Sequence, residues 1–381
     1  MRVLYIAEVQ WRSQISRKHQ LIRRFPSDWY VFFASPMNAA PGENSLITRR
    51  ERPGPTVDYV SLPLPKPDAR LAPVRAATPL LGRLGGARLA SIASSFEPDV
   101  VICSYIWAHE AVAAIRRAGT PALYDLNDLH YEFYPDDPER AREAFRALVN
   151  GVDEVAASSS RLREIAGRGV VIGNGVDLDT FRGRESAPEP EEIARSPLGG
   201  REDLVMYVGS IDDRIDFAAL ERTVEMLASR PGSGVVCVGR IFDAVRDRVR
   251  RLEAAHPDRL LFTGRVDYKR LPSFLSRASV GIAPFALNEK TAAINPNKLY
   301  MYAAMDLNVV STPFSDDVRQ YAELVYLPTD ADAFARAVNE ALGDAERRRA
   351  VRSDIALSNS WDEKAREFIK LVKRLAGQDA C

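Results

Sequence analysis

Short apolar runs alternate with longer amphipathic stretches along almost the whole chain. Runs of this length are typical of buried strands. In the first half they predict strands at Val3–Ala7, Tyr30–Ala34, Val57–Leu62, Val100–Cys103, Ala122–Asp125, Glu154–Ala157 and Val170–Ile172. In the second half they predict strands at Leu204–Val208, Val235–Gly239, Leu260–Thr263, Val280–Ala283, Val309–Ser311 and Leu324–Leu327.

The stretches between these runs have the length and spacing of helices. They predict helices at 107–118, 139–150, 160–167, 216–229, 243–255, 271–277, 298–305 and 330–342. Strands that alternate with helices imply βαβ units and parallel sheets. A Pro- and Glu-rich stretch at 186–192 separates two such series. The pattern therefore predicts an α/β protein with two doubly wound, Rossmann-like domains, 1–180 and 181–360, whose ligands bind at the carboxyl ends of the strands.

Composition agrees with a globular protein of two domains. The chain has 381 residues, with 52 Lys and Arg against 52 Asp and Glu. A net charge of zero argues against a nucleic-acid-binding protein. Residues 1–93 nevertheless hold fourteen Lys and Arg but only six Asp and Glu, so the basic excess is confined to the first domain.

Three cysteines and the N-terminus bear on the compartment. Cys103 and Cys237 lie in predicted strands, and their spacing with Cys381 suits neither zinc nor a disulfide framework. The apolar run after Met1 is too short for a signal peptide, and no stretch is long enough to span a membrane. We therefore expect a cytoplasmic protein that holds no metal.

The most informative segment is a strand at Val280–Phe285, a loop, a helix that begins near Pro296, and a strand at Val309–Thr312. Proline suits the first turn of a helix, and the helix N-terminus offers free N–H groups. Lys298 adds a cation there, which predicts an anion site suited to a diphosphate. A capped helix with a solvated lysine fits the same residues.

This segment resembles the donor-binding stretch of bacterial GT-B glycosyltransferases of the family 4-like group. Four further stretches resemble motifs of that group in the same order: 172–181, 207–216, 261–272 and 360–362. The likeness covers the chain well from about residue 150 and only loosely before it. It implies an acceptor-binding first domain, a donor-binding second domain, and a C-terminal helix at 361–381 that packs back on the first.

The resemblance also implies an activity. Members move a sugar from a nucleotide-diphosphate sugar to a hydroxyl acceptor without a metal, in the assembly of bacterial polysaccharides, glycolipids or natural-product glycosides. A UDP-sugar is the favoured donor, with GDP- and dTDP-sugars as alternatives, and the acceptor is a sugar or a lipid-linked sugar. The site must stabilise charge that develops on the departing diphosphate.

Residues carried over from the motifs form the expected donor site. Lys298 and one of Arg214, Arg240 or Arg265 would hold the diphosphate, although a solvated face explains each arginine equally well. Gly209 would let the backbone approach the donor, and the backbone near Val266 would contact the base. The same motifs add Asp216, Asn295, Leu299 and Tyr300.

Two departures from the family pattern concern the donor site. The positions of two glutamates common in the group hold Ala293 and Met301, which puts ribose recognition and retaining stereochemistry in question. The usual Gly and Pro before the last strand are replaced by Asp306 and Asn308.

Candidates for a general base follow strand ends in the first domain. Asp128 and His130 are the leading candidates and Asp125 is a weaker third, in the stretch 125–130 that follows the strand Ala122–Tyr124. His109 follows the preceding strand. Helix caps and turns in an Asp- and Asn-rich loop explain these residues as well.

The acceptor side is assigned to Trp11, Arg12 and Arg17 near the first strand and to Asn174 at the end of the domain. A segment at 66–88 carries five cations among apolar residues: Lys66, Arg70, Arg75, Arg83 and Arg88. Such a segment could bind anionic lipid at the inner face of the membrane or a phosphate-bearing acceptor. An ordinary amphipathic helix with solvated arginines explains the same residues.

Two alternative interpretations assign the same fold but a different activity. A non-catalytic nucleotide-sugar or glycan-binding paralogue is suggested by Ala293 and Met301. A UDP-N-acetylglucosamine 2-epimerase shares the architecture but needs several catalytic carboxylates and histidines, and the chain has only four His. A Rossmann dehydrogenase is disfavoured because no G-x-G-x-x-G follows the first strand.

Overall fold

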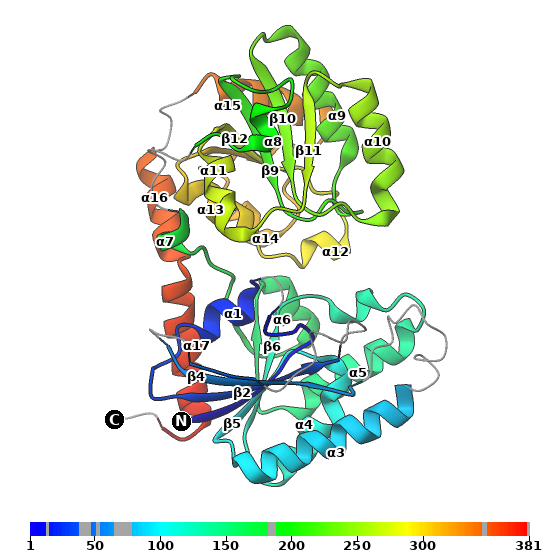
Figure 1. The fold of residues 1–381 in the computed structure, drawn as a ribbon, viewed down its shortest axis with the longest axis vertical. Helices are drawn as coiled ribbons and strands as arrows, with labels where there is room; N and C mark the ends of the chain where they lie inside the picture. Colours follow the sequence, from blue (N-terminus) through cyan, green and yellow to red (C-terminus); the bar gives the residue numbers. More distant parts are fainter. Residues whose placement is uncertain are drawn as a thin grey trace. The chain divides into compact units, whose positions relative to one another are not determined.

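A computed structural model describes residues 1–12, 15–37, 47–50, 54–64, 78–181, 188–344 and 349–378. The chain divides into two compact units: Met1–Gly173 with Lys364–Cys381, and Asn174–Glu363. Each unit is built on one sheet with helices around it (Figure 1). The two units divide between Gly173 and Asn174, whereas the sequence predicted a domain boundary after residue 180.

The first unit contains an eight-stranded sheet with the order β3-β4-β2-β1-β5-β6-β7-β8. All neighbours pair in parallel except β3, which is antiparallel to β4. The strands are β1 (Arg2–Ile6), β2 (Tyr30–Pro36), β3 (Ile47–Arg50), β4 (Thr56–Leu62), β5 (Val100–Cys103), β6 (Ala122–Leu126), β7 (Glu154–Ala157) and β8 (Val170–Val171). The predicted parallel sheet is present, and β3 is an additional edge strand.

Helices connect these strands, as the parallel pairing requires. They are α1 (Arg17–Ile22), α3 (Thr78–Phe96), α4 (His109–Arg117), α5 (Pro138–Gly151) and α6 (Ser160–Ala166), with short 3₁₀ turns η2 (Ile106–Ala108) and η3 (His130–Phe133). Arg83 and Arg88 of the basic segment lie on α3, whereas Lys66, Arg70 and Arg75 lie outside the described residues.

The second unit has a five-stranded, all-parallel sheet with the order β11-β10-β9-β12-β13. Its strands are β9 (Asp203–Val208), β10 (Ser233–Val238), β11 (Leu260–Gly264), β12 (Ala278–Ala283) and β13 (Asn308–Ser311). The predicted strand at Leu324–Leu327 is wrong. Within it, Tyr326 makes only an isolated bridge to Val310, and the rest of the run packs against the core.

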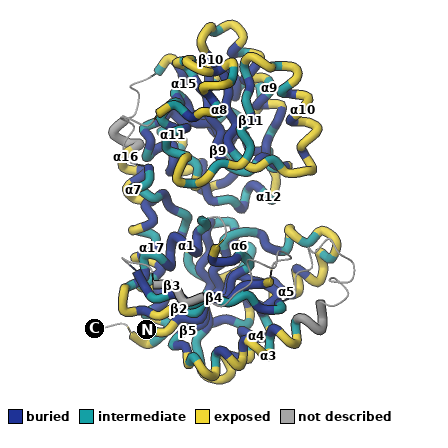
Figure 2. The backbone as a smooth tube through the Cα atoms, viewed as in Figure 1, coloured by how far each residue is buried: buried dark blue, intermediate teal, exposed yellow. Residues whose placement is uncertain are grey.

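The helices of this unit are α7 (Leu178–Phe181), α8 (Glu191–Ala194), α9 (Phe217–Met226), α10 (Arg246–Ala255), α11 (Leu271–Leu275), α12 (Glu289–Ala292), α13 (Asn297–Ala304), α14 (Asp316–Arg319), α15 (Ala331–Leu342) and α16 (Arg349–Ser358). Two apolar clusters pack on the sheet, one with α9, α10 and α15 and the other with α11, α13 and α16. The central strands of both sheets are buried along their length (Figure 2).

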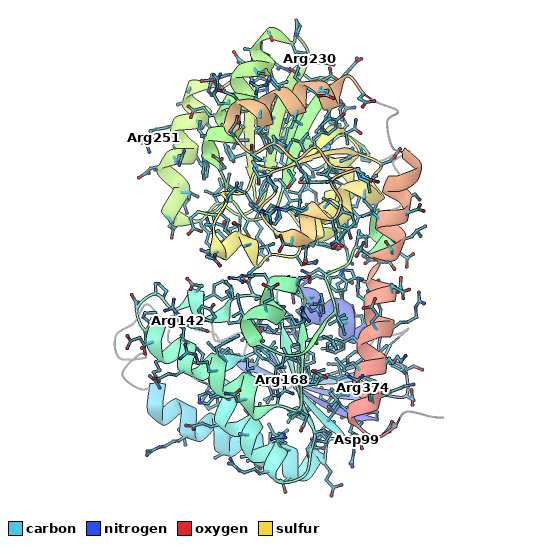
Figure 3. All side chains as sticks on the ribbon, turned by 180° about the vertical axis from the view of Figure 1, so that it is seen from behind. Asp99, Arg142, Arg168, Arg230, Arg251 and Arg374 are labelled. Atoms are coloured by element: carbon cyan, nitrogen blue, oxygen red, sulfur yellow. The ribbon has the colours of Figure 1, made fainter. Side chains whose placement is uncertain are left out.

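The last helix, α17 (Trp361–Leu375), begins in the second unit and ends in the first. In the first unit, the ring of Phe368 stacks on Phe25 with centroids 6.3 Å apart. Near its end, Arg374 Nη2 lies 3.5 Å from Glu154 Oε2. Arg374 is labelled in Figure 3. The expected return of the C-terminal helix to the first domain is therefore present in these contacts. Among the described helices, none is long and apolar enough to cross a membrane.

Candidate functional site

Helix α13 is fixed to the second sheet by one tyrosine. The Tyr302 hydroxyl accepts a hydrogen bond from the Val208 backbone N–H at 3.0 Å and donates one to the Ile282 carbonyl at 3.1 Å. These partners belong to β9 and β12, so the tyrosine joins two neighbouring strands to the helix. The N-terminal turn of α13, which carries Lys298, is thereby placed beside the carboxyl ends of β9 and β12.

Lys298 extends over aromatic faces. Its Nζ lies 4.7 Å from the ring centroid of Phe285 and 5.4 Å from that of Tyr207. The side chain passes Gly209, which follows β9; a Cβ at that glycine would lie 2.5 Å from Lys298 Cε. Gly209 thus makes room for the lysine, a different reason from the close donor approach expected of it.

The ammonium group of Lys298 has no hydrogen bond or ion pair with any described residue. Removal from water and, to a smaller extent, repulsion from Arg214 together lower the pKa of Lys298 to about 7, although attraction to Asp212 opposes the shift. An anion bound at this position would restore the charged form. The local electrostatics therefore favour a negatively charged ligand.

Arg214 is held by Asp212, which sequence reasoning did not select. The guanidinium Nε donates to Asp212 Oδ1 at 2.9 Å and Nη2 donates to Oδ2 at 2.5 Å. This bidentate pair fixes the arginine beside the end of β9 and leaves a quarter of its side chain exposed, 25%. Of the three arginines considered for the diphosphate, Arg214 is the one whose charge acts on Lys298.

Two glycines bring the carboxyl ends of β9 and β10 together. Gly239 has a φ of 156°, and a Cβ there would lie 1.8 Å from the Gly209 carbonyl oxygen. The Gly209 N–H donates to the Val238 carbonyl at 2.9 Å. No side chain fits between these two glycines, so backbone atoms form this part of the surface beside Lys298.

The remaining predicted donor residues have structural contacts. Asp216 caps α9, accepting from the Ala218 and Ala219 N–H groups at 3.0 and 3.2 Å. Leu299 and Tyr300 are buried in the core. Arg240 is exposed over the Phe242 ring, Arg265 is exposed, and Val266 packs against the core. These contacts support Lys298, Gly209 and Arg214 as one group and do not place the others with it.

Asn295 and Asn174 form a pair within the second unit. The Asn295 side-chain oxygen accepts from the Asn174 N–H at 3.0 Å, and its amide donates to Asp317 Oδ2 at 3.1 Å. Asn174 was expected on the acceptor side but is the first residue of the second unit. Ala293 and Met301, where the family pattern has glutamates, are both buried.

In the first unit, Asp125 and Arg17 form a buried ion pair at the end of β6. Arg17 Nε donates to Asp125 Oδ1 at 2.9 Å, and the Tyr5 hydroxyl donates to Oδ2 at 2.6 Å. Arg17 Nη1 also donates to the Gly173 carbonyl at 2.6 Å. Asp125 is completely buried. The pair therefore serves the packing of β1, α1 and β6, and neither the base predicted at Asp125 nor the acceptor contact predicted at Arg17 fits this position.

A second polar cluster, the Glu8 cluster, lies at the ends of β1, β5 and β6. Glu8 accepts from Lys18 Nζ at 2.5 Å through Oε1 and from the Ser104 hydroxyl at 2.8 Å through Oε2. His130 Nε2 lies 3.9 Å from Glu8 Oε1, and its Nδ1 lies 3.3 Å from the Tyr124 hydroxyl. Sequence reasoning named His130 but missed Glu8, although Glu8 follows a predicted strand.

The Glu8 cluster holds its groups in definite charge states. Burial tends to raise the pKa of Glu8, but Lys18 and then His130 outweigh it and keep that pKa below its ordinary value. Burial lowers the pKa of His130, although the Glu8 carboxylate opposes the shift. Asp128 lies beside the cluster, half-buried, and accepts from the Leu129 N–H at 2.8 Å.

The other candidate residues of the first unit contact residues outside the Glu8 cluster. His109 begins α4, and its Nδ1 lies 2.9 Å from the Ile106 carbonyl. Trp11 is buried against His19 and Phe33. Arg12 is exposed, with its guanidinium 5.6 Å from the Tyr59 ring centroid. Of these, only Arg12 presents an exposed charged group.

Comparison of the whole structure defines the class of protein. The sucrose-phosphate synthase of Thermosynechococcus elongatus superimposes with a TM-score of 0.74 over 99% of this chain and 100% of that one, at 18% identity. An α,α-trehalose-phosphate synthase (UDP-forming) from Burkholderia xenovorans, solved with glucose-6-phosphate, gives 0.72 over 98% and 100%, at 15% identity. The chain has the GT-B fold, and the predicted fold class is confirmed.

Sequence comparison finds similarity to glycosyltransferases, which in the second unit extends to a family model. Residues 202–344 match the family model of glycosyl transferases group 1. A protein of Bacillus subtilis (strain 168), named for teichuronic acid biosynthesis as the glycosyltransferase TuaH, is 27% identical over 237 residues, which are 58% of this chain and 57% of that protein. The match thus spans little more than half of the relative's length. The resemblance to GT-B glycosyltransferases is confirmed by these findings.

Proposed function

We propose that the protein is a glycosyltransferase that moves a sugar from a nucleotide-diphosphate sugar to a hydroxyl group of a sugar-bearing acceptor. The second unit binds the donor. The observation that carries this proposal is Lys298, which forms no ion pair with any described residue and whose pKa is lowered to about 7 beside Arg214. The family match to residues 202–344 covers the same unit.

The reaction needs this group of cations. When the glycosidic bond to the donor breaks, negative charge develops on the diphosphate that leaves. Lys298 and Arg214 place two positive charges beside the carboxyl ends of the strands, and the backbone at Gly209 leaves room for the oxygens. We propose that these cations take the part that a metal ion plays in other transferases, so that no metal is required.

UDP is the nucleotide we favour. One solved relative, from Escherichia coli, is described as bound with UDP-2-fluoro glucose; it has a TM-score of 0.69 and 14% identity over 98% of this chain and 99% of that one. A polysaccharide acceptor is supported by the name of the TuaH relative. Contact with a membrane surface through the segment at 66–88 is a further proposal, in which Arg83 and Arg88 are the exposed cations that the structure describes.

On the acceptor side we propose Asp128 as the carboxylate that accepts the hydroxyl proton, if the reaction inverts. Asp128 is half-buried and forms no ion pair with any described residue, in contrast to the buried Asp125. Glu8 is engaged by Lys18, and His130 is buried. Loss of turnover in Asp128→Asn, with nucleotide affinity retained, would support this role; full turnover would exclude it.

Calorimetric titration tests the donor site. UDP, GDP and dTDP are titrated in the presence of EDTA into the wild type, Lys298→Ala and, as a matched control, Lys290→Ala. Lys290 Nζ pairs with Asp213 at 3.0 Å on the surface of the same unit. We expect one nucleotide to bind, with affinity weakened in Lys298→Ala by roughly 1–3 kcal/mol and unchanged in Lys290→Ala. Binding that is absent, or indifferent to Lys298, would refute the proposal.

A further inference from the structure

The first unit contains a cavity of about 430 Å³ among three helices. Its walls come from α3, from the turn η2 and the start of α4, and from α5, with Leu64 after β4. Leu64, η2 and α5 each follow the carboxyl end of a strand, namely β4, β5 and β6 in turn. Ligands of open α/β sheets bind at such ends, so the position of the cavity favours a binding site.

Trp107 lines this cavity and contains a buried polar atom that no described residue contacts by a hydrogen bond. The residue is 7% exposed, and its indole Nε1 has no hydrogen-bond partner in the described part of the chain. The ring is held in place by Arg140, whose guanidinium carbon lies 5.4 Å from its centroid, and by Tyr134 at 5.2 Å edge to face. A buried N–H that lacks an acceptor is costly, and a ligand oxygen in the cavity would satisfy it.

Charged side chains of both signs line the same cavity. Arg83 and Arg140 can only donate hydrogen bonds, and Glu110 and Glu143 can only accept them when ionised. Arg83, Glu110 and Glu143 form no hydrogen bond or ion pair with other residues of the described part. The two positive and two negative charges balance, so the cavity does not select a strongly charged ligand.

These four charged side chains are exposed, and water solvates them in the free protein. A ligand that bonds to the buried Trp107 N–H and also reaches them at the cavity must accept and donate at several points. Hydroxyl groups do both, whereas a phosphate at neutral pH mainly accepts and would oppose the two glutamates. The rest of the wall combines small residues, among them Gly86, Ala111 and Ala144, with the larger side chains of Leu64, Leu89 and His109. A volume of this size lies in the range of small-molecule sites.

We propose that this cavity binds a neutral sugar unit of the acceptor glycan, held by Trp107, Arg83, Glu110 and Glu143. The assignment of that sugar to an acceptor rests on the proposed transferase function. The binding itself depends only on the cavity. Binding in this cavity would let the protein recognise a sugar unit of the acceptor other than the one whose hydroxyl reacts. Acceptor glycans would then be selected by that second unit.

Indole resonances provide a direct test. The chain has four Trp, so a ¹⁵N-labelled sample gives four indole N–H signals, and Trp107→Phe identifies the signal of Trp107. Cellobiose, maltose and N,N′-diacetylchitobiose are titrated as probes, with inorganic phosphate as a further arm. We expect at least one disaccharide to shift the Trp107 signal saturably, and phosphate to leave it unchanged.

Two substitutions on α3 form a matched pair. A Cβ at Gly86 meets nothing within 4 Å, so Gly86→Phe is expected to fold and to fill the cavity. Ala87, the next residue, is exposed and does not line the cavity, so Ala87→Phe is the control. The disaccharide response should be lost in Gly86→Phe and kept in Ala87→Phe.

The outcomes separate this inference from the donor proposal. No response to any disaccharide, a response to phosphate alone, or a response that survives Gly86→Phe would overturn the sugar site. UDP titrated into the same samples reports on the second unit independently. A protein that binds UDP but no sugar refutes only this inference, and one that binds sugar but no nucleotide refutes only the donor site.

Discussion

The ring of Tyr302 lies so close to Gly281 that a Cβ at that glycine would come within 2.4 Å of the tyrosine Cγ. Residue 281 lies in β12, and Tyr302 lies one turn after Lys298 on α13. The tyrosine hydroxyl also bonds to both β9 and β12, so Tyr302 joins α13 to both strands in addition to the apolar packing of the helix. The lysine that we assign to the donor is therefore placed by the core of its unit.

Tyr302→Phe should destabilise the protein. The substitution leaves the Val208 N–H in β9 without its side-chain acceptor while the ring still packs on Gly281. We expect a loss of about 1–3 kcal/mol in the free energy of unfolding, measured by urea denaturation. Tyr30→Phe is the control, since that hydroxyl bonds to Asp58 at the surface and its loss should cost about 0.5 kcal/mol or less. Equal effects of the two changes would contradict the role of Tyr302.

Lys298→Met should stabilise the free protein while it weakens nucleotide binding. The pKa of Lys298, a half-buried residue, is lowered to about 7 in the folded state, so below that pH folding carries the full cost of withdrawing the charge from water. Between about 7 and the ordinary lysine pKa the unfolded chain binds more protons, and wild-type stability therefore rises with pH. The methionine variant lacks this cost, and we expect it to be more stable by about 1 kcal/mol near neutrality.

The gain in Lys298→Met should shrink as the pH is raised. Urea midpoints of variant and wild type at two values of pH, one near neutral and one near the ordinary lysine pKa, measure the change, and groups common to both proteins cancel. A variant that is less stable than the wild type, or a difference independent of pH, would show that Lys298 is charged without cost in the free protein.

Nucleotide affinity should fall as the pH rises above about 7. A diphosphate binds the charged form of Lys298 and raises its pKa again, so binding takes up a proton. The expected fall is about tenfold for each pH unit above 7 in the wild type and absent in Lys298→Met. Calorimetry in buffers of different ionisation enthalpy counts the protons. Zero proton uptake in the wild type would argue against contact between Lys298 and the diphosphate.

Arg17→Met should be strongly destabilising because it leaves Asp125 buried without its cation. The side chains of this pair are 3% and 0% exposed, and loss of one partner of such a pair costs about 3–5 kcal/mol. The double variant Arg17→Met/Asp125→Leu should recover most of the loss. Arg2→Met breaks the pair with Glu97, which is 45% and 73% exposed, and should change stability by less than about 1 kcal/mol. If Arg17→Met is as stable as the double variant, the unpaired Asp125 carries no cost, and the interpretation as a buried charge pair is wrong.

Most of the fold was predictable because buried parallel strands are continuous apolar runs. The edge strand Ile47–Arg50 was missed because its sequence is mostly polar and basic. The strand predicted at Leu324–Leu327 is wrong for the opposite reason. The run is apolar and packs on the core, but apart from one isolated bridge it does not pair with the sheet. Periodicity reports burial more directly than it reports pairing.

The site was less predictable because it depends on partners distant in the sequence. Asp125 and Asp128 belong to one loop, yet one is buried against Arg17 and the other is half-buried without an ion pair among the described residues. Glu8 meets Ser104 from across the chain. The rule that ligands bind at strand ends would have selected Glu8, but only the fold shows that Lys18 neutralises it.

Asp306→Gly should stabilise the second unit. Helix α13 ends with the Leu307 N–H bonded to the Tyr302 carbonyl at 2.9 Å and the Asp306 N–H bonded to the Ala303 carbonyl at 3.1 Å. This is a Schellman motif, which requires a left-handed residue at its turn, and Asp306 has a φ of 57°. The left-handed backbone is the reason that an aspartate is strained at this position, and it agrees with the Gly that the family pattern has there.

Glycine adopts this conformation without a clash between Cβ and the following carbonyl, so we expect Asp306→Gly to gain about 0.5–1 kcal/mol in thermal or urea unfolding. Asp306→Ala is the discriminating comparison. Alanine cannot form the local hydrogen bonds that help aspartate adopt the left-handed region, and it should lose about 1 kcal/mol. The order Gly, Asp, Ala in stability identifies backbone conformation as the cause. If Ala equals or exceeds Gly, the effect comes from the lost carboxylate, and the turn itself is unstrained.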